Sequence, residues 1–323
     1  MRVIVIGAGG LLGTAFRLAA DEQPEITDLL LPGRRELDVT EQVEVERYVS
    51  ATRPDVVINA AVLLPADLCE SHPEVAYSIH ALGARWVARA CARVGALPVY
   101  VSTDFVFDGT GRSPYLPDSA PHPVLTYGIT KQAGEHETRV ASGRHLVVRT
   151  AGLFGPAPSS PRARSCFVSR ILERAAQGQP LRVVDTVVMS PTYTVDLARM
   201  TFALSFDGAV GTYHVVNQGS ATWHELACAA VEMAGYDVRV EREEEQHHVA
   251  TPRPTYTPLA GDLPGRVAGL QRPWRVALRE CVDGLRQASE ISAAGGRRGG
   301  ERAGAPASEP ATAAAAAAVG RRP

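Results

Sequence analysis

The chain has 323 residues and a mass of 34.4 kDa, with 45% hydrophobic and 21% charged residues. This length supports one large domain or two smaller ones, which excludes a small scaffold that depends on disulfides or metals. The formal net charge of −2 gives no electrostatic footprint for nucleic acid or an anionic membrane. The five cysteines are widely spaced and match neither a zinc pattern nor a disulfide framework, so we expect a reduced, cytoplasmic protein without a metal.

The N-terminal stretch, MRVIVIGAGGLLGTAF, places Arg2 before an apolar run, as a signal peptide does. Glycines interrupt the run, Arg17 follows it, and no convincing cleavage site is present, which is more typical of a strand followed by a helix. No apolar run in the chain reaches the roughly 18 to 20 residues that span a bilayer. We therefore expect no membrane partner.

In the first half of the chain, apolar β-branched runs alternate with segments of helical periodicity. Near-continuous apolar strands separated by helices indicate a parallel sheet covered on both faces. The predicted fold class is α/β, with a Rossmann-type doubly wound parallel sheet. We expect strands at Arg2–Ile6, Thr27–Leu31, Asp55–Asn59, Pro98–Ser102 and His145–Arg149, and helices at Leu11–Ala20, Val43–Ala51, Glu74–Val94 and Tyr127–Ala141.

After Arg149 the pattern changes and predicts a second, smaller α/β substrate lobe. The predicted organisation is a dinucleotide-binding domain (1–150, with a returning segment at about 183–217), a discontinuous lobe (151–182 and 218–290) and a disordered Ala/Gly/Arg/Pro-rich tail (291–323). Helices are expected at Cys166–Gln177, Trp223–Ala234 and Pro273–Gln287, and β segments at Leu181–Val188, Gly211–Asn217 and Val238–Val240; Gly211–Asn217 is the strand expected to return to the sheet.

A glycine-rich turn follows the first predicted strand and begins the first predicted helix. In such a turn one glycine permits a tight bend, a second lets the backbone approach a pyrophosphate, and a third lets the helix pack on the strand. The unpaired N–H groups of the helix N-terminus then face the phosphates. The alternative is a tight turn that needs glycine without any ligand. We interpret the turn as a nucleotide site formed by Gly7, Gly10, Leu11, Leu12 and Gly13.

The end of the second predicted strand carries Gly33, Arg34, Arg35 and Glu36, about where an acidic residue would accept the adenosine ribose hydroxyls. Two guanidinium groups can bind a 2′-phosphate, and no carboxylate is expected at the position that the ribose diol requires. In a chain this rich in arginine, the two residues are alternatively solvated loop charges. The segment favours NADPH over NADH.

Tyr127 and Lys131 lie one turn apart on the same face of a predicted helix, and Thr103 ends the strand before it. A free phenol titrates near 10. An ammonium about 4 Å away is worth roughly 4 kcal/mol at an effective dielectric of 20, which would lower the phenol pKa and make Tyr127 a usable general acid. Thr103 can hydrogen-bond the same carbonyl oxygen.

This spacing also occurs on ordinary amphipathic helices. Lys131 is, however, the only lysine, and every other one of the 33 Lys and Arg residues is arginine. A compact ammonium at this position fits a contact with both the phenol and the cofactor ribose, so we predict that Thr103, Tyr127 and Lys131 are catalytic and that Tyr127 and Lys131 also bind the cofactor.

With these motifs in place, the chain resembles the extended short-chain dehydrogenase/reductases and, within them, the dTDP-4-dehydrorhamnose reductase family. The resemblance covers about residues 1 to 287. The matching stretches are Gly7–Gly13, Leu37–Thr40, Ile58–Ala61, Val101–Gly109, Tyr127–Glu135, Val148–Thr150, Ser190–Tyr193, Asp196–Ala198, Gly211–Val215 and Arg253–Pro254.

The resemblance implies NADPH-dependent reduction, as part of deoxysugar biosynthesis, of the C4 keto group of a 4-keto-6-deoxyhexose carried on dTDP, by a monomer or homodimer. It places Asp38 and Val39 beside the adenine. It also implies that Ala60, Ala61, Val62 and Leu63 line the cofactor, and that Thr103 and Asp104 contact the sugar.

Two residues depart from the family pattern. Gly152 stands where family members usually have a tryptophan against the sugar ring, and His80 stands where an asparagine is usual. Loss of an indole would open space and remove apolar contact, so we expect a wider sugar pocket beside Gly152. The identity of the sugar is the property that these departures affect.

Other functions on this fold remain open. A related dehydratase has an Asp-Glu pair after the threonine, whereas here Asp104 is followed by Phe105, which is neither an acid nor a base. An epimerase is a further alternative. A non-catalytic reading is an NADP-binding regulatory subunit that resembles that of methionine adenosyltransferase; the complete set of Thr103, Tyr127 and Lys131 favours catalysis.

Overall fold

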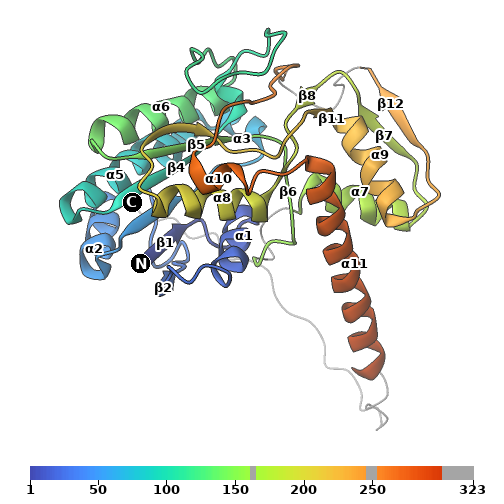
Figure 1. Ribbon diagram of the computed structural model, residues 1–323, viewed down its shortest axis with the longest axis horizontal. Coiled ribbons are helices and arrows are strands. Elements are labelled where there is room, and N and C mark those ends of the chain that lie inside the picture. Colours follow the sequence, from blue (N-terminus) through green and yellow to red (C-terminus); the bar gives the residue numbers. More distant parts are fainter. Residues whose placement is uncertain (161–164, 245–252, 300–323) are drawn as a thin grey trace, which may run out of the picture. The chain divides into compact units, whose positions relative to one another are not determined.

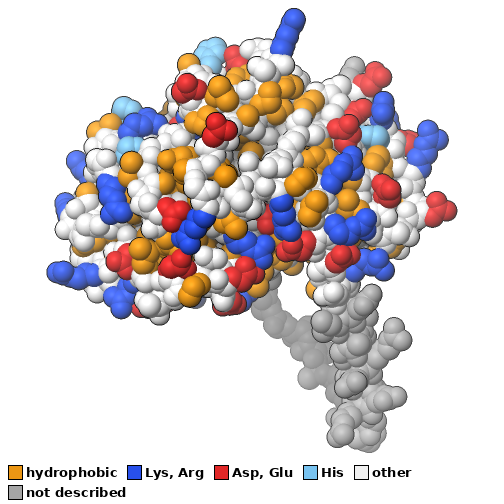
Figure 2. Space-filling model, in the orientation of Figure 1, with side chains coloured by type: hydrophobic (Ala, Val, Ile, Leu, Met, Phe, Trp, Pro, Cys, Tyr) orange, Lys and Arg blue, Asp and Glu red, His pale blue; other side chains and the backbone are white. Residues whose placement is uncertain are grey.

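Figure 1 shows the computed structural model of the chain, which describes residues 1–160, 165–244 and 253–299. Residues 1–285 form one compact unit, and residues 286–323 form a second. No helix among the described residues is both long and apolar enough to cross a bilayer. Figure 2 shows basic and acidic side chains interspersed over the visible face, without a large patch of either sign.

The centre of the first unit is a six-stranded sheet in which every neighbouring pair is parallel. The order is β10-β5-β4-β3-β1-β2, so strand order reverses between β1 and β3. This confirms the predicted doubly wound sheet, and the pairing of β10 with β5 places the returning strand where the sequence predicts it. The strands are β1 (Arg2–Ile6), β2 (Asp28–Leu30), β3 (Val56–Asn59), β4 (Leu97–Thr103), β5 (Leu146–Thr150) and β10 (Gly211–His214).

Both faces of this sheet are buried because its strands carry apolar residues at successive positions. Val3 and Val5 belong to one core cluster, and Ile4 and Ile6 to another. Helices α1 (Leu11–Ala20) and α8 (Thr194–Phe206) contribute to the first cluster. On the other face α2 (Gln42–Thr52) packs on α5 (Gly83–Val94), which in turn packs on α6 (Thr126–Ala141) (Figure 1). Alternation along the strands thus produces the two layers of helices.

The sequence reasoning did not predict α8, and it predicted one continuous helix over Glu74–Val94. Helix α8 is buried almost all round, so it lacks the polar face that signals an amphipathic helix. The predicted helix instead consists of α4 (Pro73–Tyr77), a π-helical turn η1 (Ser78–Leu82) and α5. Such π turns are frequent at functional sites. Helix α3 (Ala66–Ser71) precedes them, and the 3₁₀ turn η2 (Asp104–Val106) follows β4.

Some of the elements after β5 lie outside the main sheet and form small sheets, one of which has a core cluster of its own. Strands β7 (Leu181–Val184) and β12 (Val240–Glu243) pair in parallel, and α7 (Phe167–Ala176) and α9 (Trp223–Ala234) lie beside them (Figure 1). The boundary between a dinucleotide domain and a substrate lobe remains a prediction, because residues 1–285 form a single compact unit. The other short strands are β6 (Leu153–Phe154), β8 (Val188–Met189), β9 (Thr192–Tyr193) and β11 (Ala221–Thr222).

The last described elements are α10 (Gly265–Ala268) and α11 (Trp274–Gly299). Helix α11 continues past the Pro273–Gln287 segment predicted for it, into residues that the sequence reasoning assigned to the tail. The rest of that tail, 300–323, lies outside the described residues. At the start of α11, Ala277, Leu278, Cys281 and Val282 are buried at helical spacing in the main core.

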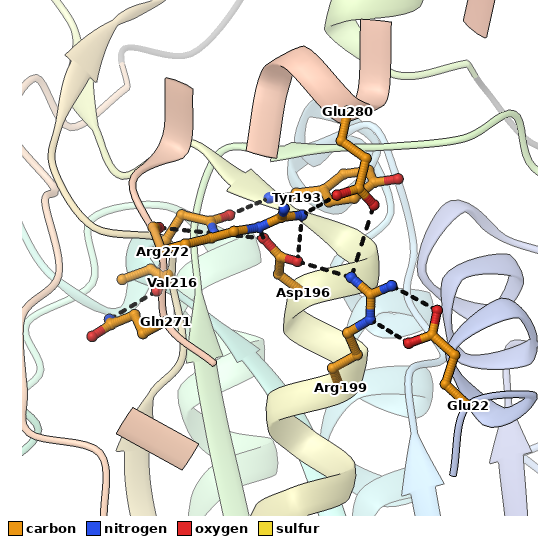
Figure 3. A network of polar contacts seen from close by, with 9 residues as sticks. Glu22, Tyr193, Asp196, Arg199, Val216, Gln271, Arg272 and Glu280 are labelled. Atoms are coloured by element: carbon orange, nitrogen blue, oxygen red, sulfur yellow. Dashed lines mark hydrogen bonds and ion pairs between the residues drawn. The ribbon is translucent and has the colours of Figure 1, made fainter. Parts of the chain in front are cut away.

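A polar network joins the start of α11 to α8 and to the end of α1 (Figure 3). Buried Asp196, in the first turn of α8, accepts two 2.8 Å hydrogen bonds from the Arg272 guanidinium. Arg199, on the same helix, makes two 2.7 Å bonds to Glu22 at the end of α1, and Arg272 also pairs with Glu280 at 2.6 Å. Every charge in the network faces an opposite one, so burial of Asp196 leaves no uncompensated charge.

Candidate active site

The carboxyl ends of β1 and β3 lie where strand order reverses, which is the usual ligand position of a doubly wound sheet. Gly7 follows β1 with φ +86°, a conformation that favours glycine. A Cβ at Gly7 would lie 2.9 Å from the carbonyl carbon and oxygen of Ala60. Glycine is therefore required for the turn after β1 to approach the segment after β3.

The remaining glycines of this turn have separate roles. A Cβ at Gly13 would lie 2.4 Å from the Cα of Ala8, so Gly13 permits α1 to pack on the turn. Gly10 is the N-cap of α1 and has extended backbone with no side-chain cap, and a Cβ there would meet only the Gly7 oxygen at 3.4 Å. The N-terminus of α1, at Leu11 and Leu12, thus has no capping side chain, and this fits the predicted phosphate site.

A second segment contacts this turn that the sequence reasoning missed. The Ser160 N–H donates to the Gly9 oxygen at 3.1 Å, and the Ser159 N–H donates to the Thr14 hydroxyl at 2.8 Å. The only sequence signal was the glycine and proline punctuation after β6, which indicates a loop but not its position.

The turn after β2 is more complex than the sequence predicts. Arg34 is exposed and pairs with Asp38 at 2.9 Å, and Arg35 is exposed as well. The Glu36 carboxylate accepts a 2.8 Å bond from the Gly33 N–H and is therefore engaged by the backbone of this turn. Desolvation of Asp38 is outweighed by hydrogen bonds from Thr40 and Arg34, and the pKa of Asp38 is lowered. Arg34 and Arg35 are thus both exposed at this turn, and the acids Glu36 and Asp38 each have a partner within it.

The segment after β3, which carries Ala60, Ala61, Val62 and Leu63, is fixed by polar contacts at both ends. The Ala61 N–H donates to the Asn59 side chain at 3.2 Å, and the Leu63 N–H donates to His80 Nε2 at 2.9 Å. Val39, predicted beside the adenine, is buried, and a Cβ at Gly83 would lie 2.6 Å from its side chain. The predicted cofactor-lining residues thus lie on three neighbouring segments that follow β1, β2 and β3.

His80 connects this segment to α6. It lies buried in the π turn and accepts from Leu63 through Nε2, so its other nitrogen, Nδ1, is the donor to the Thr130 hydroxyl at 2.8 Å. Thr130 in turn donates to the Tyr127 carbonyl at 3.0 Å. Burial lowers the pKa of His80 to about 2, with a smaller contribution from Lys131. His80 is therefore a neutral link between the segment after β3 and the helix that carries Tyr127.

Lys131 lies fully inside the molecule, 3% exposed. Its Nζ donates to the Val101 carbonyl at 2.5 Å and lies 4.2 Å from the centre of the Tyr100 ring. Glu135 lies one turn further along α6. Two nitrogens of the Arg149 guanidinium donate to its carboxylate at 2.8 and 2.7 Å, so Glu135 pairs with Arg149 and makes no ion pair with Lys131 among the described residues. Burial lowers the pKa of Lys131 to about 7, against the opposing charge of Glu135.

The Tyr127 ring lies edge-on to His80 and Phe105, with centroids 5.7 and 5.8 Å away. Burial raises the pKa of its phenol, and a hydrogen bond with Thr103 and the charge of Arg253 act in the opposite direction. The sequence argument expected Lys131 to lower this pKa, and that direction is wrong because desolvation dominates. The result is a phenol that keeps its proton at neutral pH, which is the form that a proton donor requires.

Two glycines let α6 reach this position. A Cβ at Gly128 would lie 2.0 Å from the Phe105 carbonyl oxygen, and one at Gly134 would lie 2.2 Å from the His80 carbonyl oxygen. Both contacts involve backbone atoms that cannot move away easily. The segment Tyr127–Gly134 therefore carries two glycines that permit close packing, in addition to Tyr127 and Lys131. The prediction from the sequence used only the tyrosine and the lysine.

Thr103 and Asp104 form a buried pair at the carboxyl end of β4. The Thr103 hydroxyl donates to Asp104 Oδ1 at 2.9 Å and accepts from the Phe105 N–H at 3.2 Å. Thr257, far along the chain, donates to Asp104 Oδ2 at 2.6 Å. Burial raises the pKa of Asp104 to about 6, while hydrogen bonds from Thr257 and Thr103 act against it. Thr257 has no sequence signal that the reasoning could have used.

Arg253 adds a positive charge near the same residues. Its Nη2 lies 2.8 Å from Asp67 of α3, and its guanidinium lies over the Phe105 ring at 5.9 Å. Arg253 belongs to one of the stretches that resemble the reductase family, but no role was predicted for it from the sequence. No cluster of three or more metal-ligating side chains occurs among the described residues.

The structure corrects the expectation of open space at Gly152. Its φ is +54°, and a Cβ there would lie 2.5 Å from the Met189 sulfur and 2.9 Å from the Ser190 carbonyl oxygen. The space beside Gly152 is therefore filled by residues that follow β7. The backbone conformation and the nearby Met189 side chain therefore both favour glycine at this position, and the wider sugar pocket stays a prediction.

Comparisons with known proteins agree with this geometry. The family model described as RmlD substrate binding domain matches residues 1–287. A dTDP-4-dehydrorhamnose reductase of Streptomyces griseus is 35% identical, with 88% of this chain and 94% of the relative covered. A dTDP-4-keto-6-deoxy-D-glucose reductase of Streptomyces niveus is 33% identical, with 86% and 96% covered.

A solved structure gives the same result. The crystal structure of dTDP-4-dehydrorhamnose reductase from Bacillus anthracis in complex with NADP has a TM-score of 0.80 and 33% identity, covering 87% of this chain and 98% of its own. The match extends over both the parallel sheet and the elements after β5. The chain therefore belongs to the dTDP-4-dehydrorhamnose reductase family, which the sequence motifs indicated.

Proposed function

We propose that the chain reduces the C4 keto group of a dTDP-4-keto-6-deoxyhexose with NADPH. The observation that carries this proposal is the position of protonated Tyr127 beside Thr103 and Lys131, on the carboxyl side of the sheet that bears the uncapped α1 N-terminus. The names of the two Streptomyces relatives supply the substrate class, and the Bacillus anthracis complex supplies the cofactor.

NADPH, when bound, supplies the hydride that C4 receives. Tyr127 then gives its phenolic proton to the keto oxygen, so that ketone, hydride and proton form the alcohol and NADP⁺. Thr103 offers a second hydroxyl to the same oxygen. The ammonium of Lys131 holds positive charge near the phenolate that remains, and solvent restores the proton to Tyr127.

Gly7, Gly10 and Gly13 shape the turn that would hold the pyrophosphate, with the N–H groups of Leu11 and Leu12 directed at it. Arg34 and Arg35 would bind the 2′-phosphate, although Arg34 must share its guanidinium with Asp38. Asp38 and Val39 would lie beside the adenine, and residues 60–63 would line the cofactor. All five cysteines are free thiols, which fits a reducing cytoplasm.

The test is a panel of dTDP-4-keto-6-deoxyhexoses, each incubated with NADPH, with the stereochemistry of the product alcohol determined by NMR. We expect stoichiometric NADPH oxidation with at least one sugar. An epimerase would convert its substrate without net oxidation of NADPH. A regulatory subunit would turn over none of the sugars and would co-purify with a larger synthetase. Either result would contradict the proposal, and size-exclusion chromatography with light scattering would decide between monomer and homodimer.

A further inference from the structure

The hydroxyl of Thr103 is already committed in this structure. A threonine hydroxyl has one proton to donate and two lone pairs to accept. Thr103 gives its proton to Asp104 Oδ1 at 2.9 Å and accepts from the Phe105 N–H at 3.2 Å, which leaves one lone pair for the phenol of Tyr127, its remaining partner. In this arrangement Thr103 has no proton for a keto oxygen, although the proposed reaction requires one.

We propose that Asp104 is a positioning residue whose carboxyl group sets the direction of the Thr103 hydroxyl. This inference rests on the proposed reductase function. When Asp104 is ionised, it accepts the Thr103 proton. When Asp104 has taken up a proton from solvent, its O–H donates to Thr103 Oγ1, and the Thr103 proton turns to the keto oxygen. No substrate bond forms or breaks in this step.

The surroundings of Asp104 permit both forms. The side chain is buried, 5% exposed, and makes no ion pair among the described residues. Its oxygens receive hydroxyl protons from Thr103 and Thr257 instead of a guanidinium or ammonium. Because a carboxylate without a counter-charge is costly to bury, protonation is within reach at moderate pH, in agreement with its raised pKa of about 6.

The ionisable groups around this pair are Tyr127 and Lys131 of α6, Cys69 of α3 and Arg253 of the segment that carries Thr257. Burial holds Tyr127 protonated and raises the pKa of Cys69 to about 11, and an arginine stays charged, so these three do not titrate near pH 6. Lys131, whose pKa is lowered to about 7, is the group from which Asp104 must be separated experimentally.

The experiment is the pH dependence of single-turnover NADPH oxidation, from about pH 5 to about pH 8, for wild type, Asp104→Asn, Thr257→Val and Thr257→Ser. Loss of one hydrogen-bond donor to a developing oxyanion typically costs about 100- to 1,000-fold. We expect the wild-type rate to fall toward that extent as Asp104 ionises. Asparagine does not titrate, so Asp104→Asn should lose this part of the profile and keep the part governed by Lys131.

The Thr257 variants test the same group from its other oxygen. Thr257→Val removes a hydrogen bond that favours the carboxylate, so the midpoint of the decline should move to higher pH. Thr257→Ser keeps the hydroxyl and should leave the midpoint in place. An Asp104→Asn profile that matches wild type, or an unmoved midpoint in a folded Thr257→Val, would overturn the inference while the reductase function stands.

A readout without catalysis separates the two proposals. In protein labelled with ¹³C at the aspartate carboxyls, the signal absent from Asp104→Asn should titrate near pH 6 in wild type and at higher pH in Thr257→Val. If wild type oxidises no NADPH with any sugar, the reductase proposal fails, and this titration still reports on Asp104. An Asp104 signal that titrates near 4, the ordinary value, overturns the inference about Asp104 alone.

Discussion

The cofactor side and the substrate side of the site differ in how much of their geometry is set by residues that are neighbours in the sequence. On the cofactor side, Gly7 and Gly13 act within one strand, turn and helix, and Gly7 also permits the close approach of Ala60. The Ser159 N–H adds a hydrogen bond to Thr14 from 145 positions away. On the substrate side, Asp104 is held by Thr257, 153 positions away, and Arg253 binds Asp67, 186 positions away. The glycine turn of the first region depends mainly on local backbone geometry, whereas the buried carboxyl of the second depends on contacts that exist only after folding.

This difference determines what each region can tolerate. A glycine turn is specified by steric limits that apply within a few residues. A buried carboxyl that is held by threonines from distant segments depends on the precise docking of those segments. We therefore expect changes on the cofactor side to alter binding locally, and changes on the substrate side to combine effects on catalysis with effects on folding.

The largest expected effect is the loss of the Tyr127 hydroxyl. Tyr127→Phe removes the proton donor and should reduce single-turnover NADPH oxidation by about 100- to 10,000-fold. Tyr100→Phe is the matched control, because the Tyr100 hydroxyl donates to the His80 carbonyl at 3.0 Å and takes no part in the reaction. It should cost about 1 kcal/mol of unfolding free energy and leave the rate within a few-fold. Equal rates for the two variants would refute the assignment of Tyr127.

Lys131→Arg tests whether a compact ammonium is required. In the structure Nζ of Lys131 is enclosed by the Val101 carbonyl and the Tyr100 ring. A planar guanidinium overfills this space, at a cost of about 1–3 kcal/mol, and should lower the rate at least about 100-fold. Lys131→Met keeps the shape without the charge and should fold but react slowly. A Lys131→Arg enzyme within threefold of wild type would contradict the mechanism.

The sequence predicted the fold further than it predicted the site. Strand β1 and helices α1 and α9 have the residue ranges expected for them, because the spacing of apolar residues and the positions of glycines are local signals. The π turn around His80 and the buried helix α8 were missed, since neither shows a distinctive local pattern. The direction of the Tyr127 pKa and the space at Gly152 were wrong because both depend on what packs there: desolvation in one case and Met189 in the other.

Gly152 sharpens the comparison on the substrate side. If Gly152 opened a wider sugar pocket, Gly152→Trp would fill it, whereas the structure predicts a folding defect. Even Gly152→Ala adds left-handed strain of about 1–2 kcal/mol and overpacking against Met189 and Ser190 of about 1–3 kcal/mol. Urea unfolding would measure this loss. Gly143→Ala, which meets no atom within 4 Å, is the control and should be close to neutral.

A second variant identifies the atom responsible. Met189 is buried in the main core, so Met189→Ala alone should cost about 2–5 kcal/mol. Relative to that single variant, the added Gly152→Ala should cost less than it does in wild type, but not nothing, because the Ser190 carbonyl oxygen, 2.9 Å from the added Cβ, remains. A Gly152→Ala protein as stable as wild type would show that the segment around Met189 moves away easily, and the predicted wider pocket would then have to be reconsidered.

On the cofactor side, changing Arg34 and Arg35 together to alanine should erase most of the preference for NADPH. A charge-assisted contact is worth about 1.5–3 kcal/mol, or roughly 10- to 150-fold in the ratio of kcat/KM for NADPH over NADH. Because Arg34 already pairs with Asp38, Arg35→Ala alone should account for the larger part. Glu36→Gln is the control: if Glu36 bound the ribose diol, this variant would lose activity with NADH instead.

His80 joins the two regions, and its effect should appear in the pH dependence of stability. In the folded protein burial lowers its pKa to about 2, whereas in the unfolded chain it titrates near 6.5. Below pH 6.5 the unfolded chain therefore binds a proton at His80 and the folded protein does not. As the pH falls, this difference lowers the unfolding free energy of wild type by about 1.4 kcal/mol per pH unit. His80→Asn cannot show this loss.

At pH 8 His80→Asn should be less stable than wild type by about 1–3 kcal/mol, because its shorter side chain cannot reach both Leu63 and Thr130. By pH 5 this gap should close by about 2 kcal/mol, since only wild type suffers the proton uptake. Urea unfolding at pH 8, 6 and 5 measures the gap, and subtraction of the two proteins cancels the opposite contribution of Asp104. A gap that stays constant over this range would mean that His80 accepts a proton in the folded state, which is incompatible with its bond from the Leu63 N–H and with its role as the neutral link between cofactor segment and catalytic helix.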